Sequence, residues 1–195
     1  EKRHGIILAR NLKAKEYGIT TAESLRDALK KCPNLVIVPP RYESFLYYTN
    51  KVKDIYREYT DQVESFGLDE AWLDLTHSQS IFGDAETIAR TIQKRVHDEI
   101  GLTVSVGLSF NKVFAKLGSD MIKPSGFVVI TANNYQDVVW NLPVEDLLYV
   151  GRKTKEKLNA RSIYTIGELA NRTPGYMKTL LGKVGEMIWA FANGY

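Results

Sequence analysis

The chain contains 195 residues, of which 44% are hydrophobic, 25% charged and 11% aromatic. This composition is typical of globular proteins and excludes a collagen-like or largely disordered chain. No apolar run approaches the roughly 20 residues of a membrane-spanning helix, and the single cysteine, Cys32, excludes an internal disulfide and a cysteine zinc cluster. We therefore expect one or two domains with hydrophobic cores, in a reducing cytoplasm and not in a membrane.

Charge is unevenly distributed around the formal net charge of +3. Residues 1–31 carry a net charge of +4, residues 32–144 carry −4 and residues 145–195 carry +3. An acidic centre between basic flanks suits an enzyme that uses metal ions on a polyanion such as nucleic acid. Charge differences of this size also arise by chance, so the pattern alone does not identify a partner.

Hydrophobic periodicity divides the chain into a short N-terminal part, a mixed central part and a helical C-terminal part that begins near Tyr135. The diproline Pro39–Pro40 predicts a domain edge between the first two parts. In the N-terminal part we expect a helix over 21–29 and a strand over 35–38. In the central part we expect helices over 44–59, 84–100 and 111–121, and strands over 62–68, 71–75, 103–108 and 127–130. This order resembles a ferredoxin-like α+β core that lacks its opening strand.

Two adjacent acids, Asp69 and Glu70, lie at the predicted turn between strands 62–68 and 71–75. Carboxylates held close together repel each other unless a cation lies between them, and Mg²⁺ prefers such oxygen ligands. The turn could bring both side chains to one metal site, but acids are also ordinary polar turn residues. Asp74 alternates with core residues, and we expect it to accept a backbone N–H rather than to bind a metal.

Basic residues gather in two later segments. Lys112 and Lys116 lie four apart on one helix face, and Lys123 follows just before Pro124. A helix start with nearby lysines can hold phosphate oxygens, although solvated lysines are the ordinary alternative. Five Lys or Arg residues lie between Gly151 and Arg161. A glycine turn that opens such a helix suits binding of a DNA backbone without reading its sequence, and a solvated helix face is the alternative.

Together, these segments resemble the Y-family (translesion) DNA polymerases, the DNA polymerase IV and UV-mutagenesis repair group. The segment Ser65–Asp74 resembles the palm hairpin of that family, and Gly107–Gly126 resembles its second palm signature. Residues 9–19 resemble the fingers motif, and Gly151–Leu158 resembles the helix-hairpin-helix of the thumb. The two palm segments are the specific ones, and the other two matches are looser.

The resemblance implies partial fingers over residues 1–40, a palm over 41–130 and an all-helical thumb over 131–195. It implies error-prone DNA synthesis in the response to DNA damage, in which dNTPs are added to a primer 3′ end opposite damaged template with two Mg²⁺ ions. Asp69 and Glu70 match two catalytic, metal-binding carboxylates. The implied nucleotide-binding residues are Asn11, Lys15 and Lys123. The implied DNA-binding residues are Gly151, Arg152, Lys153 and Lys155.

The chain also departs from the family pattern. Lys15 stands where an arginine is usual, so the charge is kept but the bidentate fork is lost. No segment before Ile6 matches the family's first strand, which carries the first catalytic aspartate, and the little-finger domain and clamp-binding tail are missing. We therefore expect a fragment that does not polymerise alone. Its parent would bind primer–template DNA, dNTPs and a sliding clamp in the cytoplasm, at the nucleoid.

Two other readings remain open. A nucleotide cyclase uses a related core and two metals, but its Gly-Gly-acid-acid-Phe turn is not matched by Gly67–Trp72. A non-catalytic DNA-binding relative would bind DNA in a salt-dependent way and would not need Asp69. Metal-dependent binding of dNTP separates the three readings.

Overall fold

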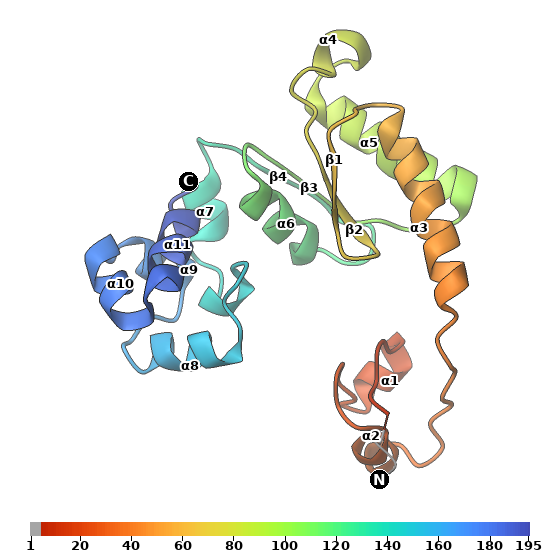
Figure 1. Ribbon diagram of the computed structural model, residues 1–195, viewed down its shortest axis with the longest axis horizontal. Helices are drawn as coiled ribbons and strands as arrows, with labels where there is room; N and C mark the ends of the chain where they lie inside the picture. Colours follow the sequence, from red (N-terminus) through yellow and green to blue (C-terminus); the bar gives the residue numbers. More distant parts are fainter. Residues whose placement is uncertain (1–4) are drawn as a thin grey trace. The chain divides into compact units, whose positions relative to one another are not determined.

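The computed structural model describes residues 5–195, and the chain divides into two compact units on either side of the Tyr42–Glu43 bond (Figure 1). The first unit contains α1 (Leu12–Glu16) and α2 (Leu25–Lys31). Both helices begin at a side-chain cap: Asn11 accepts the N–H of Ala14, and Ser24 accepts the N–H of Asp27. Ile7, Ile19 and Ala28 form the small core of this unit.

Two predictions for this unit are wrong. The helix predicted over 21–29 begins only at Leu25, because Ala22 has a left-handed backbone with φ of 67°. Residues 35–38 are not a strand: no β-pairing forms there among the described residues, and Val36 is 83% exposed. An apolar, β-branched run has the local propensity for a strand, but propensity forms no ladder without a partner.

The second unit begins with α3 at its border and contains all the strands found in residues 5–195 (Figure 1). Its elements confirm the predicted order of helices and strands from residue 44 to residue 130, and they add the short helix α4. They are α3 (Tyr42–Arg57), β1 (Val63–Phe66), β2 (Glu70–Leu73), α4 (Gln79–Phe82), α5 (Ala85–Arg95) with its π-helical extension (Val96–Ile100), β3 (Val106–Ser109), α6 (Lys112–Met121) and β4 (Phe127–Ile130).

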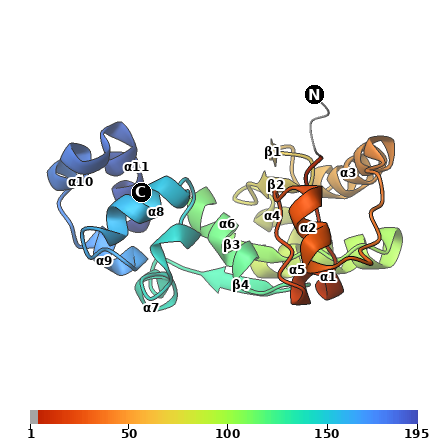
Figure 2. The same cartoon turned by 90° about the horizontal axis from the view of Figure 1, so that it is seen from below.

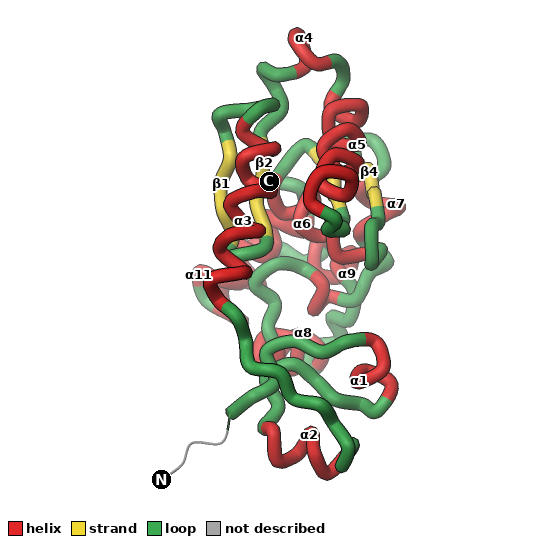
Figure 3. Tube along the Cα trace, turned by 90° about the vertical axis from the view of Figure 1, so that its right-hand side faces the viewer, coloured by secondary structure: helices red, strands yellow, loops and turns green. Residues whose placement is uncertain are grey.

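The strands form two separate sheets rather than one. β1 and β2 are an antiparallel hairpin in which Phe66 lies opposite Glu70, whereas β3 and β4 are a parallel pair in which Val106 lies opposite Phe127. In the described part of the chain, no strand joins the two pairs. The helices α3 and α5 lie side by side along the hairpin (Figures 1 and 3). Their core with the hairpin contains Ile55, Leu75, Ile88, Ile92 and Val96.

Only helices and turns follow β4, as predicted, and in Figure 2 they gather beyond the β3–β4 pair of this unit. Their core is continuous with α6 and β4, because Phe114 and Ile130 pack in the same buried cluster as Leu158 and Met177. The helical elements are α7 (Tyr135–Val139), a 3₁₀ turn (Val144–Asp146), α8 (Arg152–Asn159), α9 (Ile166–Ala170), α10 (Pro174–Leu181) and α11 (Lys183–Ala192). None of the described helices is long and apolar enough to cross a membrane.

Candidate active site

The β1–β2 hairpin presents the two adjacent acids. Gly67 begins its turn with φ of 74°, a conformation that glycine adopts without strain. The Oγ1 of Thr49 on α3 donates a hydrogen bond to the Leu68 carbonyl at 2.7 Å, which ties the turn to that helix. The rings of Phe66 and Trp72 pack across the two strands with centroids 4.8 Å apart. The turn is therefore held on both of its sides.

Asp69 and Glu70 lie where the turn meets β2. Asp69 is the last turn residue and is exposed, and Glu70 is the first residue of β2, with a side chain that is 36% exposed. The predicted turn centred on residues 68–71 is thus shifted, because the strands end at Phe66 and resume at Glu70. Asp74 accepts the backbone N–H of Thr76 at 2.9 Å, which confirms its predicted structural role.

A chain of ion pairs runs from Glu70 along α6. The Nζ of Lys116 lies 2.7 Å from Glu70 Oε1 and 2.7 Å from Asp120 Oδ2. The other oxygen of Asp120, Oδ1, lies 2.7 Å from the Nζ of Lys123. An acid and a lysine that the sequence predicts as separate site residues, Glu70 and Lys123, are therefore linked through two intervening side chains.

The pKa shifts of Lys116 and Asp120 keep these two groups charged at neutral pH. Burial lowers the pKa of Lys116, but its hydrogen bonds to Asp120 and Glu70 outweigh burial, and the pKa is raised overall. Burial raises the pKa of Asp120, but its hydrogen bonds to Lys116 and Lys123 outweigh burial, and the pKa is lowered. Lys116 therefore keeps its proton beside the ionised carboxylate of Asp120.

Sequence reasoning named Lys116 only as a possible phosphate contact, and it missed both Asp120 and the pairing of Lys116 with Glu70. The sequence places Lys116 on a helix face where a solvated lysine is the ordinary interpretation, yet its side chain is only 17% exposed. Its spacing of four from Asp120 is the one local signal, since residues four apart meet on a helix surface. The pairing with Glu70 spans 46 positions, and no local pattern shows it.

The predicted nucleotide-binding residues of the first unit lie on α1. The side-chain oxygen of Asn11 caps the helix by accepting the N–H of Ala14 at 2.9 Å. Lys15 lies in the last turn of the same helix and is exposed. Lys123 lies in the second unit, just after α6, with a side chain that is 59% exposed.

The predicted DNA-binding residues open α8. Gly151 is the N-cap of this helix and, having no side chain, leaves its first N–H groups without a side-chain partner. Arg152 is 86% exposed and lies 3.8 Å from Glu156, and Lys155 pairs with Glu145 at 2.5 Å. Lys153 forms no ion pair within residues 5–195. Helix amides and three cations, of which Lys153 forms no ion pair in the described part of the chain, thus lie at one exposed end.

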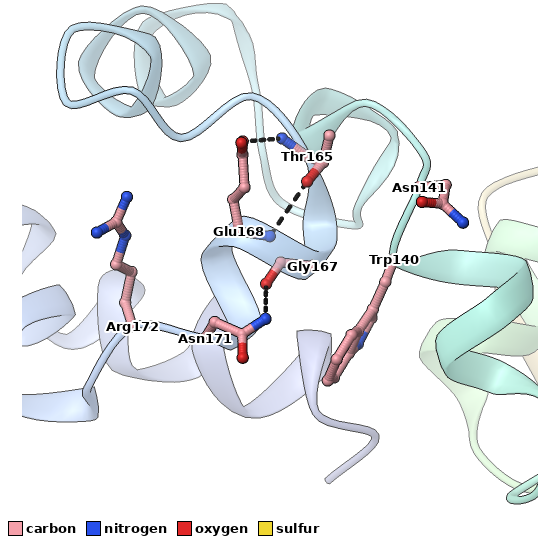
Figure 4. Close-up of a pocket in the computed structure, with 7 residues that line it drawn as sticks. All are labelled: Trp140, Asn141, Thr165, Gly167, Glu168, Asn171 and Arg172. Carbon is pink, nitrogen blue, oxygen red and sulfur yellow. Dashed lines mark hydrogen bonds between the residues drawn. The ribbon is translucent and has the colours of Figure 1, made fainter.

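A pocket of about 430 Å³ lies in the helical part, and none of the predicted site residues lines it (Figure 4). Its polar groups serve the start and end of α9. Thr165 and Glu168 cap each other's backbone N–H groups, and the side-chain amide of Asn171 donates to the Gly167 carbonyl at 2.8 Å. Hydrogen bonds from the backbone N–H groups of Tyr164 and Thr165 lower the pKa of Glu168. The pocket is therefore a feature of helix capping, and we assign no ligand to it.

Comparison with known families decides the identity of the chain. The model of the impB/mucB/samB family matches residues 1–120. The chain belongs to this family. The matched residues include Asp69, Glu70 and Lys116, and they end before Lys123 and α8. The predicted Y-family membership is confirmed, since this is the family of the UV-mutagenesis repair proteins.

Curated relatives of this impB/mucB/samB chain include proteins named DNA polymerase IV. The protein from Acetivibrio thermocellus is 51% identical over 195 residues, which cover 100% of this chain and 49% of that protein. The protein from Pseudomonas syringae pv. tomato is 39% identical over 193 residues, which cover 99% of this chain and 55% of that protein. The chain thus spans about half the length of the curated relatives it matches.

Solved structures share the fold. DinB from Sulfolobus solfataricus has a TM-score of 0.86 at 23% identity, covering 99% of this chain and 57% of that one. The insertion ternary complex of Dbh DNA polymerase has a TM-score of 0.86 at 24% identity, covering 98% of this chain and 56% of that one. At this identity the likeness shows that the impB/mucB/samB chain shares their mixed α and β fold.

The donor groups of this impB/mucB/samB chain fit Mg²⁺ in chemistry. Within residues 5–195, no three His, Cys, Asp or Glu side chains gather in a metal-binding group. Asp69 and Glu70 nevertheless supply carboxylate oxygens from consecutive residues at an accessible turn. Mg²⁺ is usually bound by one or two carboxylates, with water and substrate phosphates completing its six ligands. The two acids therefore fit a cation that arrives with a nucleotide.

Proposed function

We propose that the protein carrying this sequence is a DNA-directed DNA polymerase of the translesion type. It adds dNTPs to a primer 3′ end opposite damaged template. The observation that carries this proposal is the ion-pair chain that links the hairpin acid Glu70 to Lys123 through α6. The relatives named DNA polymerase IV and the fold shared with a ternary complex of a DNA polymerase support it.

In this mechanism the hairpin acids bind metal ions, and the lysines neutralise the negative charge of the nucleotide phosphates. Asp69 and Glu70 would hold two Mg²⁺ ions, which supply a lowered pKa for the primer hydroxyl and charge neutralisation for the leaving pyrophosphate. Lys123 would exchange Asp120 for a triphosphate oxygen, since its ammonium is exposed. Asn11 and Lys15, at the start and in the last turn of α1, would contact phosphate oxygens of a nucleotide. Lys15 would do so as a point charge without the two-pronged geometry of arginine.

The basic end of α8 would hold the primer–template. Gly151 allows the DNA backbone to approach the helix N-terminus, and Arg152, Lys153 and Lys155 add positive charge there. Such contacts fix the position of the duplex but do not read its sequence, which suits an enzyme that must accept any template. We propose primer–template DNA and dNTPs as the partners, and a sliding clamp as a further partner of the protein at its natural length.

The test replaces each acid in the protein at its natural length. We expect Asp69→Asn and Glu70→Gln to lower primer extension with Mg²⁺ by roughly 100-fold or more, because each removes a charged metal ligand. Binding of primer–template, measured by fluorescence anisotropy, should stay close to wild type. Asp137→Asn, an exposed acid on α7, is the matched control and should extend normally. Undiminished turnover in either site variant would contradict the proposal.

We also infer that residues 1–195 alone do not extend a primer. Two carboxylates leave a pair of metal ions short of a shared ligand, and the described residues hold no third acid beside them. The purified 195-residue chain should bind primer–template yet show no extension with Mg²⁺ and dNTPs. Robust extension by this chain would show that its own residues complete the site.

A further inference from the structure

Lys116 has an environment unlike that of the other lysines near the hairpin. Its side chain is 17% exposed, compared with 58% for Lys112 and 59% for Lys123. Burial of a lysine costs free energy unless its charge is compensated. The Lys116 ammonium lies 2.7 Å from a carboxylate oxygen on each of two acids, Glu70 and Asp120. The arrangement is therefore specific to this position and is not a property of the helix surface.

The contact leaves half of the Glu70 carboxylate available. Lys116 bonds to Oε1, and within residues 5–195 no hydrogen bond reaches Oε2. Glu70 remains 36% exposed, so a cation can approach that second oxygen. A carboxylate with one oxygen held by a donor presents its other oxygen in a fixed direction.

The backbones on both sides of this contact are fixed. On the helix side, Gly107 of β3 lies so close to α6 that an added Cβ would be 1.9 Å from the Ala115 carbonyl oxygen. The hydroxyl of Ser119 donates to the Lys116 carbonyl at 2.7 Å. On the hairpin side, the Trp72 indole donates to the Lys112 carbonyl at 2.9 Å. The backbone that carries Lys116 is therefore held in place relative to Glu70 by packing and hydrogen bonds.

We propose that Lys116 is a positioning residue that acts through Glu70. It holds Oε1 so that Oε2 faces a divalent cation, and Asp120 in turn holds Lys116 in place. The proposal rests on the proposed function, since it assumes that Glu70 binds the metal of nucleotidyl transfer. Outer partners of metal ligands typically matter by 10- to 100-fold in metal affinity or activity. The Lys116 ammonium already contacts two acids, so in this role it does not contact the triphosphate directly.

The test is steady-state primer extension by the protein at its natural length, titrated with Mg²⁺ at saturating dNTP and with dNTP at saturating Mg²⁺. We expect Lys116→Met to raise the Mg²⁺ concentration for half-maximal rate by about 10- to 100-fold, with KM for dNTP unchanged at saturating Mg²⁺. Lys116→Arg keeps a charged donor and should recover part of the loss. Lys94→Met, which breaks an exposed lysine–aspartate pair on α5, is the matched control and should leave both titrations unchanged.

The outcomes separate the two proposals. If wild-type protein extends primers and Glu70→Gln abolishes extension, but Lys116→Met leaves the Mg²⁺ titration unchanged, positioning by Lys116 is wrong. A rise in KM for dNTP with an unchanged Mg²⁺ requirement would mean that Lys116 contacts the triphosphate directly, which also overturns the inference. If Lys116→Met does not fold, as judged by circular dichroism, Lys116→Arg decides: an unshifted Mg²⁺ requirement then contradicts the proposal. Failure of Glu70→Gln to slow extension would overturn the proposed function itself.

Discussion

The indole Nε1 of Trp72 donates a hydrogen bond to the backbone carbonyl of Lys112 across 2.9 Å. This bond joins β2 to the first turn of α6. In the described part of the chain, no strand pairing links the β1–β2 hairpin to the β3–β4 sheet. The Lys112 side chain extends over the Trp72 ring and pairs with Glu64 on β1. The position of the acidic hairpin relative to α6 therefore depends on a few side chains.

We expect Trp72→Phe to loosen this attachment. Phenylalanine keeps an aromatic ring beside Phe66 but cannot donate the hydrogen bond, so the free energy of unfolding should fall by about 1 kcal/mol. The Tm of thermal unfolding and the rate of primer extension should both decrease. Trp140→Phe is the matched control, because it removes the equivalent bond from Trp140 to the Ala192 carbonyl in the helical part. It should lower stability similarly but leave extension unchanged, and equal effects of both variants on extension would contradict this account.

The contact between β3 and α6 predicts a strong effect of one methyl group. In Gly107→Ala the new Cβ would lie 1.9 Å from the Ala115 carbonyl oxygen and 2.6 Å from the Ser119 nitrogen, both of them backbone atoms of a packed helix. We expect destabilisation by several kcal/mol, or loss of the folded state, in chemical denaturation. Gly175→Ala on α10 meets nothing within 4 Å and should stabilise the protein by up to about 1 kcal/mol. Similar stability of the two variants would show that α6 can move away from β3.

Acid should weaken the contact between α3 and α5 through Arg95. This guanidinium pairs with Glu58 at 2.6 Å and with Glu99 at 2.5 Å. The hydrogen bond from Arg95 lowers the pKa of Glu58 below its ordinary value of 4.5, against a smaller effect of burial. A carboxyl with a lowered pKa stabilises the fold above its ordinary pKa, and that contribution disappears as pH falls through the lowered pKa.

Arg95→Met should therefore lower Tm at pH 7, and its difference from wild type should shrink as pH falls below about 4.5. Arg95→Lys keeps the charge but not the two-pronged geometry, so its Tm should lie between that of wild type and that of Arg95→Met. Calorimetry between pH 3 and pH 7 would check this. A Tm difference that stayed constant over this range would show that the pair does not titrate with folding.

Salt dependence would reveal the contribution of the α8 cations to DNA binding. Lys153→Ala should weaken binding of primer–template about equally for all sequences, because a phosphate contact carries no sequence information. It should also reduce the slope of log K against log salt by about 0.9, the value for one lost phosphate contact. Fluorescence anisotropy at several salt concentrations measures both. Lys183→Ala, an exposed lysine at the start of α11, should leave the slope unchanged; the same loss of slope in both variants would argue against a localised interface.

The spacing of apolar residues was sufficient to predict an element where that spacing matches the face the element buries. The helix predicted over 111–121 is α6, and its apolar residues Val113, Phe114 and Leu117 are all buried. The same reasoning failed over residues 35–38, where propensity predicts a strand but the described residues offer no partner strand. It also missed α4, whose four residues are too few for a period to appear.

The site shows the same division. Asp69 and Glu70 stand out in the sequence because they are adjacent acids between two apolar strands. Lys116 does not stand out, since its role depends on a residue 46 positions away and on the close packing of α6 against β3. The split into two sheets likewise depends on which strands meet in space, and a one-dimensional pattern does not encode this.

The brevity of the strands has a consequence for how this protein behaves in solution. Each of the four strands from β1 to β4 spans four residues and pairs with one partner, so one side of its backbone lacks a neighbouring strand within residues 5–195. Open backbone of this kind templates aggregation when it is long and flat, whereas short edges offer little to an incoming molecule. A variant with a longer β2 or β3 would therefore have a more rigid sheet but a lower solubility.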